Sequence, residues 1–334
     1  MNIIMVYHGP HPVHEAWAHA VGARLIDYTL IGATIRRLFG ADSLFTYAFY
    51  TFCSRFFKVF FHFFPSKTGV AIVEGIHPLL NVIPLKRRKW KIFLLAVSSL
   101  VNYSHEFLLK LLKNVDAIIA VSKLTFDSLN KLTDAPVRIV YPFIDIDRFK
   151  KINADLRSEN IVFVGRLDWS KGVDMLPAIY KIIRKEFKNV NMYILGQGPL
   201  KKLLMKNVRK GFYPLGYISR PEDYFRRASI YVHPARYDSF PISVLEAMAS
   251  GLIPIVTNMT GTKDAVEKVS PDLVVKPRAR DIAKKILEIL RMDIKDRKDL
   301  SERARKVAFN FNKSRSIKQF METFQYLLKC VSLT

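Results

Sequence analysis

The chain has 334 residues, of which half are apolar and a quarter are charged. This composition excludes a disordered protein, and the length suits two domains of about 150 residues each. The formal net charge of +24 favours a nucleic acid, an anionic membrane or a phosphorylated ligand as partner, without choosing among them. The two cysteines, Cys53 and Cys330, are far apart, which indicates a reducing compartment and no disulfide or zinc scaffold.

The N-terminal sequence MNIIMVYHG predicts a buried strand. It lacks the basic region and the cleavage site of a signal peptide, so we expect a cytoplasmic protein.

Short apolar runs alternate with helix-length segments along the first half of the chain. This alternation is typical of βα units and predicts a parallel sheet. The expected strands are residues 2–7, 23–28, 70–74, 91–97, 117–122 and 137–141.

Residues 44–64, LFTYAFYTFCSRFFKVFFHFF, are unusually rich in phenylalanine. Their length would suit a membrane span, but two central cations, Arg55 and Lys58, argue against one. With His62 these cations recur on one helix face, a pattern typical of a helix that lies in a membrane interface. The alternative is a core helix with a narrow polar stripe. We favour the interface, because the aromatic surface exceeds what one small sheet could cover.

A second basic segment, residues 86–90, reads KRRKW and would add attraction to anionic lipid. A basic loop of this kind is also common on any solvated surface. The sequence therefore predicts a cytoplasmic protein peripherally associated with an anionic membrane through residues 44–64 and 86–90.

Residues 143–160 are polar and irregular and are expected to form a linker. The βα pattern then restarts, and residues 314–330 carry apolar side chains at helical spacing. We predict an α/β protein with an N-terminal Rossmann-like domain (1–142), a linker (143–160), a C-terminal Rossmann-like domain (161–313) and a closing helix (314–334). The expected strands of the second domain are residues 161–164, 191–195, 212–215, 230–232, 253–257 and 273–275.

The loop after residues 161–164 contains a glycine, Gly165, and two cations five residues apart, Arg166 and Lys171. A guanidinium can bind two phosphate oxygens, and an ammonium supplies a point charge beside it. The strand–glycine–helix context favours a phosphate site over an exposed basic loop. A second glycine turn, GQG at 196–198, follows one βα unit later and is weak evidence alone.

The segment ARYDSFPISVLEAMASG, residues 235–251, predicts a turn and then a helix from Pro241 to Ala249, closed by Gly251. Two carboxylates, Asp238 and Glu246, bracket free backbone N–H groups at the helix start. Carboxylates bind sugar hydroxyls and N–H groups bind phosphate, so the pattern suits a sugar nucleotide. The alternative is an ordinary βα turn with solvated acids.

Four motifs, VGRLDWSKGVD, LGQGP, LGYIS and HPARYDSFPISVLEAMASGLIPIV, occur in order between residues 161 and 266. Together they resemble the second domain of retaining glycosyltransferases of family 4, which have the GT-B fold. The first half resembles the family only through DAIIAVS (116–122) and YPFIDIDRF (141–149).

The resemblance implies roles for individual residues. Arg166 and Lys171 would neutralise the donor diphosphate, Asp238 would contact the donor sugar, and Glu246 would hold the ribose hydroxyls. The other implied donor-binding residues are Gly9, Gly165, Ile218, Ser239, Phe240, Pro241 and Ile242.

Three departures from the family pattern are visible. The first acid is Asp238 where Glu is usual, the first loop has Gly9 followed by Pro10 where many members have two glycines, and serines replace a usual histidine after residues 91–97. His77 and His105 are candidate acceptor-site substitutes for that histidine, and each can equally be a structural histidine.

The implied function is transfer of a hexose, with retention, from a nucleotide sugar (UDP or GDP) to a lipid-linked or other membrane-presented acceptor. No cofactor and no metal is expected, because two cations serve the leaving group and no DxD-type cluster stands out. The alternatives are a sugar-nucleotide binder without catalysis and a basic nucleic-acid-binding protein. No nucleic acid is expected as partner, because no DNA- or RNA-binding motif is present.

Overall fold

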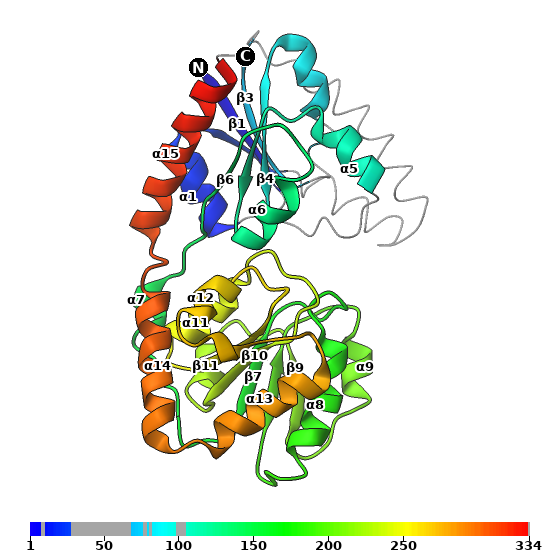
Figure 1. Ribbon diagram of the computed structural model, residues 1–334, viewed down its shortest axis with the longest axis vertical. Helices are drawn as coiled ribbons and strands as arrows, with labels where there is room; N and C mark the ends of the chain where they lie inside the picture. The colour runs from blue at the N-terminus through cyan, green and yellow to red at the C-terminus, as the bar shows by residue number, and fades with distance from the viewer. Residues whose placement is uncertain (8–10, 28–67, 76–78, 80–81, 98–104, 333–334) are drawn as a thin grey trace. The chain divides into compact units, whose positions relative to one another are not determined.

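The computed structural model describes residues 1–7, 11–27, 68–75, 79, 82–97 and 105–332. The chain divides into two compact units (Figure 1). Unit 1 contains residues 1–141 and 316–334, and unit 2 contains residues 142–315. The expected linker, residues 143–160, thus lies within unit 2, and most of the expected closing helix lies within unit 1.

Unit 1 is built on a six-stranded parallel sheet of order β2-β1-β3-β4-β5-β6. The central strands are almost wholly apolar and buried, as expected where helices cover both faces of a sheet. The strands are β1 (Asn2–Tyr7), β2 (Arg24–Asp27), β3 (Gly69–Glu74), β4 (Lys91–Ala96), β5 (Ala117–Ala120) and β6 (Val137–Ile139).

The described helices of unit 1 place aromatic and aliphatic side chains against this sheet. They are α1 (Pro12–Ala20), η1 (Ile83–Arg88), α5 (His105–Leu112) and α6 (Lys123–Leu129), with α15 (Lys313–Ser332) from the end of the chain. Trp17 of α1 stacks on Phe320 of α15 at 5.0 Å between ring centroids, and its Nε1 donates a hydrogen bond to Ser316 Oγ. Phe324 of α15 packs edge-on against Phe93 of β4. Residues more than 200 positions apart therefore complete one core.

Unit 2 has a second six-stranded parallel sheet, of order β12-β11-β10-β7-β8-β9. Its strands are β7 (Ile161–Val164), β8 (Met192–Leu195), β9 (Phe212–Gly216), β10 (Ile230–His233), β11 (Ile253–Thr257) and β12 (Val274–Val275). The helices are α7 (Ile146–Phe149), η2 (Val173–Met175), α8 (Leu176–Ile183), α9 (Lys201–Met205), α10 (Glu222–Phe225), α11 (Ile242–Ala249), α12 (Lys263–Glu267), η3 (Pro271–Leu273), α13 (Ala279–Arg291) and α14 (Ile294–Ala308).

All twelve strands expected from the sequence are present, with ends that differ by a few residues, and the prediction of two doubly wound parallel sheets is confirmed. The apolar runs identify the strands because a strand buried on both faces needs no alternation. Among the described helices, none is both long and apolar enough to cross a bilayer.

The structure describes one of the two predicted membrane contacts of unit 1, residues 86–90. Residues 44–64 lie outside the described residues. In the 86–90 segment, Trp90 is buried in the core of unit 1 and Lys86 Nζ lies 2.7 Å from both oxygens of Asp116, whereas Lys89 is exposed.

Two histidines, His11 and His14, lie at the start of α1 in unit 1. The rings of His11 and His14 stack at 4.4 Å, and His14 Nδ1 lies 3.1 Å from Glu74 Oε2. Burial, followed by the neighbouring His14, lowers the pKa of His11 from 6.5 to about 4, although Glu74 acts in the opposite sense. His11 is therefore neutral in the folded chain at pH values where the unfolded chain protonates it.

We predict that the folded protein loses up to about 3 kcal/mol of stability from His11 as the pH falls from about 6.5 to about 4. The sign follows because the unfolded state binds the extra proton in this window. Denaturant unfolding of a His11→Gln variant should show a weaker pH dependence there. The control is His19→Gln, at an exposed position near the other end of α1. An unchanged slope in His11→Gln would contradict the prediction.

Candidate functional site

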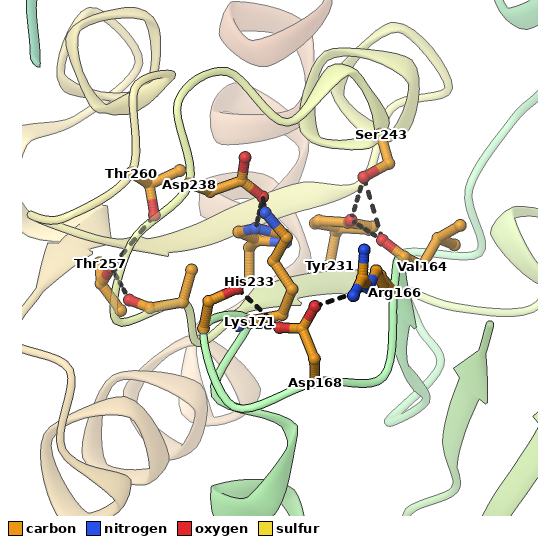
Figure 2. Close-up of polar contacts among 12 residues, drawn as sticks. Val164, Arg166, Asp168, Lys171, Tyr231, His233, Asp238, Ser243, Thr257 and Thr260 are labelled. Atoms are coloured by element: carbon orange, nitrogen blue, oxygen red, sulfur yellow. Dashed lines mark hydrogen bonds and ion pairs between the residues drawn. The ribbon is translucent and has the colours of Figure 1, made fainter. Parts of the chain in front are cut away.

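The candidate site lies at the carboxyl ends of β7 and β10, which are neighbours in the sheet of unit 2 (Figure 2). Ligands of doubly wound sheets bind outside this edge. Two loops meet there, residues 165–172 after β7 and residues 234–241 after β10.

Asp168 fixes the conformation of the first loop. Its Oδ1 accepts hydrogen bonds from Ser170 Oγ (2.6 Å) and from the backbone N–H of Lys171 (3.1 Å). Its Oδ2 lies 2.9 Å from Arg166 Nε. One carboxylate therefore orients both predicted phosphate-binding cations.

The second loop holds the first in place. The backbone N–H groups of Arg236 and Tyr237 both donate to the carbonyl oxygen of Ser170, at 2.8 and 3.1 Å. The Arg236 guanidinium makes a bidentate pair with Asp174 (2.6 and 2.7 Å) and lies 4.3 Å from the centre of the Trp169 ring. These contacts join the two loops into one rigid edge.

Gly172 is required where the loops cross. Its φ is +68°, in the left-handed region, and a Cβ at this position would lie 2.0 Å from the carbonyl oxygen of Pro234. Only glycine avoids both the strain and the overlap.

Lys171, Asp238 and His233 form an ionic cluster in which Asp238 and His233 are buried and Lys171 is partly buried (Figure 2). Lys171 Nζ lies 2.7 Å, and His233 Nε2 2.9 Å, from the same oxygen of Asp238, Oδ2. Burial raises the pKa of Asp238, but the hydrogen bond from His233 and the charges of His233 and Lys171 outweigh it, so its pKa lies below the usual value. Asp238 is therefore ionised, and its second oxygen points away from both Lys171 and His233 (Figure 2).

Arg166 is placed differently from Lys171. Its side chain is 72% exposed and its contact with Asp168 uses Nε. The rest of the guanidinium lies beyond Nε, away from Asp168 (Figure 2). The structure thus places one partly buried cation, Lys171, and one exposed cation, Arg166, on the same loop.

The start of α11 lies beside this loop. The hydroxyls of Tyr231 and Ser243 are 2.8 Å apart, and each lies 3.0 Å from the carbonyl oxygen of Val164 at the end of β7. Burial raises the pKa of Tyr231, which keeps its proton for these bonds. No side chain caps the N-terminus of α11, where Pro241 occupies the N-cap position. The first N–H groups of this helix are thus available to an anion.

Glu246 lies inside α11 and is partly buried. Burial raises the pKa of its carboxyl from 4.5 to about 7; Arg148 acts in the opposite sense, and Glu222 and Asp145 reinforce the rise. Arg148 is itself engaged, since its Nε lies 2.5 Å from Glu222 Oε1. A carboxylate kept half-ionised near neutral pH, without a dedicated cation, is suited to a ligand that supplies hydrogen-bond donors.

The remaining predicted donor residues lie on the same unit. Gly165 directly follows β7, and Ser239, Phe240 and Pro241 are buried between β10 and α11. Ile218 lies two residues beyond β9, whose Gly216 accepts a hydrogen bond from the N–H of Gly196. The GQG turn serves packing: a Cβ on Gly196 would lie 1.8 Å from the Gly165 carbonyl oxygen, and one on Gly198 2.3 Å from that of Leu167.

Two of the candidate residues from the first half, Gly9 and His77, lie outside the described residues, as do Ser98 and Ser99. His105 is exposed at the start of α5 in unit 1. In the parts of the chain that the structure describes, no group of three or more His, Cys, Asp and Glu side chains could hold a metal ion.

Sequence reasoning did not single out His233, Asp168 or Arg236 as contributors to this site. His233 ends a buried strand, and only the sheet register reveals that it faces Asp238. Asp168 was visible three residues before Lys171, the spacing at which an aspartate can accept from a turn N–H.

The fold and the sequence comparisons agree. Two six-stranded parallel sheets of this order define a GT-B fold, and the structure of Anabaena HepE, solved in complex with UDP and glucose, is similar over 97% of this chain and 99% of its own (TM-score 0.75, 12% identity). Residues 145–307 match the family described as glycosyl transferases group 1.

Two curated relatives are named as uncharacterized glycosyltransferases. One, from Haemophilus influenzae, is 33% identical over 121 residues, which cover 34% of this chain and 34% of the relative. The other, from Methanocaldococcus jannaschii, is 24% identical over 234 residues, which cover 65% of this chain and 60% of the relative. The chain thus spans between about a third and 60% of the length of these two relatives.

We predict that Gly172→Ala lowers the free energy of unfolding by more than about 2 kcal/mol, because it adds an overlap with Pro234 to left-handed strain. Gly22→Ala is the matched control, since Gly22 has nearly the same φ (+66°) but nothing within 4 Å of the added Cβ. It should cost only about 1 kcal/mol. If chemical denaturation showed equal losses of unfolding free energy in Gly172→Ala and Gly22→Ala, the two loops would not be tightly packed where they cross.

We predict that Glu246→Gln stabilises the ligand-free protein by about 1–3 kcal/mol at pH 8. The folded-state pKa is raised, so the wild type loses stability as the pH climbs from 4.5 through about 7, and the glutamine variant does not. The difference should vanish below pH 4.5. Glu267→Gln, at an exposed position on α12, serves as control and should change little. A destabilised Glu246→Gln at pH 8 would refute this assignment.

Proposed function

We propose that the protein is a glycosyltransferase that uses a nucleoside diphosphate sugar as donor, bound at the carboxyl edge of the unit 2 sheet. The observation that carries this proposal is the convergence of Arg166, Lys171 and the uncapped start of α11 at one edge. Three independent sources of positive potential at one place suit a diphosphate. The group 1 family match over residues 145–307 and the names of the relatives support the same class.

The leaving group determines what these cations do. When the bond between the anomeric carbon and the phosphate oxygen breaks, negative charge develops on that phosphate. Lys171 has three N–H donors and uses one on Asp238, so others remain for phosphate. Arg166 contributes the terminal guanidinium nitrogens that Asp168 leaves unused. Preorganised donors of this kind stabilise the developing charge without reorganisation during the reaction.

The two acids would hold the hydroxyl groups of the donor. Asp238 is ionised and has one oxygen not used by Lys171 or His233, which can accept from a hydroxyl of the sugar. Because Lys171 and His233 both contact the other oxygen, the shorter aspartate side chain is held in a single position. Glu246, without a dedicated cation, would accept from ribose hydroxyls, and its raised pKa makes nucleotide affinity increase as the pH rises through about 7.

We extend the proposal to a hexose donor and to transfer with retention. The acceptor oxygen would bond to the anomeric carbon on the side from which the phosphate leaves, and the departing phosphate would take the acceptor proton. HepE was solved with UDP and glucose, which supports a UDP-hexose as the first donor to test. A lipid-linked or other membrane-presented acceptor, and a contribution of His105 to binding it, remain part of this proposal.

Lys171→Ala should lower the rate of sugar transfer, or of donor hydrolysis, by a factor of at least about 100, because the leaving phosphate loses its partly buried cation. Lys268→Ala, which removes an exposed cation from the same unit, is the matched control and should leave the rate unchanged. The donor is chosen first by thermal stabilisation with a panel of UDP and GDP sugars, since a bound ligand raises apparent stability.

The outcomes separate the alternative functions. Stabilisation by a nucleotide sugar without turnover would indicate a sugar-nucleotide binder without catalysis. Near-normal turnover in Lys171→Ala would contradict the assigned mechanism. Salt-sensitive retention of DNA, with no response to nucleotide sugars, would instead favour a nucleic-acid-binding protein.

A further inference from the structure

An exposed apolar surface lies along one edge of unit 2, from α9 to the end of β9. Of the ten large apolar side chains that are exposed among the described residues, five lie between residues 203 and 217. β9 is the last strand of its sheet, and α9 packs beside it (Figure 1). The five exposed side chains are those of Leu203, Met205, Val208, Leu215 and Tyr217.

These side chains are not part of the core of unit 2. On α9 the core contact is made by Leu204, which is fully buried, while its neighbours Leu203 and Met205 are 40% and 49% exposed. On β9 the buried side chains are Phe212 and Pro214, while Leu215 is 39% exposed. We call residues 201–217 the α9–β9 surface. Its inner face packs into the core of unit 2, and its outer face is exposed.

The same surface is strongly basic. Residues 200–220 contain no Asp or Glu. In the described part of the chain, none of the cations of this surface makes an ion pair with a carboxylate. They are Lys201, Lys202, Lys206, Arg209 and Lys210. Their charges are therefore uncompensated and favour an anionic partner.

The side chains between the cations distinguish the kinds of anionic partner. Single-stranded nucleic acids are bound by stacking aromatic rings set among cations, whereas four of the five exposed apolar side chains here are aliphatic. Aliphatic side chains that alternate with lysines are instead typical of segments that rest in the interface of an anionic bilayer.

Pairing with a second copy through the edge of the sheet is also disfavoured. Pro214 lies within β9, so this edge strand lacks one backbone donor in its middle. Side-chain contacts, which a lipid surface requires, are therefore favoured over strand pairing at this edge.

We propose that the α9–β9 surface docks unit 2 on an anionic lipid bilayer. The apolar side chains enter the interfacial layer, and the lysines and arginine contact the lipid phosphates. The proposal does not depend on the glycosyltransferase function, because lipid binding is measured without any nucleotide sugar.

The test is co-sedimentation of the full chain with vesicles of phosphatidylcholine, with and without phosphatidylglycerol. We expect the wild type to bind the anionic vesicles and to be released by salt. A Lys202→Glu, Lys206→Glu variant should lose at least about tenfold in partition coefficient. A Leu203→Ser, Met205→Ser variant should also bind less, with its charge unchanged.

The matched control is Lys295→Glu, Lys298→Glu, which makes the same change of net charge at two exposed positions of α14. It should bind vesicles as the wild type does. Equal losses of vesicle binding in both charge variants would show that only net charge matters and would overturn the proposal. Binding that is unaltered in all variants would also overturn it. Loss of DNA retention without loss of vesicle binding would assign the surface to nucleic acid. Thermal midpoints establish that each variant is folded.

Discussion

The shared oxygen of Asp238 is the constraint on which the candidate site depends. Lys171 and His233 both approach Oδ2, so the position of the lysine is fixed by a carboxylate that is itself fixed by a fully buried ring. A buried charge is costly unless it is paired, and here the pairing brings together the loop after β7 and the loop after β10. Asp168, Arg236 and Gly172 then determine the path of the backbone between them. The geometry of the site is therefore determined by ionic contacts between the loops, and β7 and β10 fix the positions at which these loops begin.

Electrostatic strain at Glu246 contrasts with this satisfied cluster. Burial, with Glu222 and Asp145 nearby and Arg148 already paired, raises the pKa of this carboxyl, which we expect to destabilise the folded chain near neutral pH. Natural proteins retain such groups where a ligand compensates them, since function and stability place opposite demands on one position. Under the proposed function the donor's ribose would supply the missing hydrogen bonds. Burial of the Glu246 carboxyl would then favour binding of a ligand that carries neighbouring hydroxyl groups, because those groups would relieve its unfavourable free energy.

Much of the fold follows from local sequence, and only part of the site does. Apolar runs such as 161–164 and 253–257 match β7 and β11, because a parallel strand that is buried on both faces is apolar along its whole length. The helix start at Pro241 and the cations of the first loop were equally visible. The contact between Lys171 and Asp238 was not, because it depends on which strands are neighbours: β7 and β10 are adjacent although two strands separate them in sequence. The basic, apolar outer face of α9 and β9 escaped notice for a related reason. Its residues satisfy helix and strand patterns, and only their exposure sets them apart.

The packing of α15 has a consequence for the order in which the chain can fold during synthesis. Unit 2 is one continuous stretch, residues 142–315, and all its strands have left the ribosome before α15 is complete. Unit 1 is made first but needs Phe320 against Trp17 and Phe324 against Phe93, and both phenylalanines are translated only after unit 2. The half that is synthesised first is therefore the half that finishes last. Until then its incomplete core exposes an aromatic surface, which makes the nascent chain prone to aggregation.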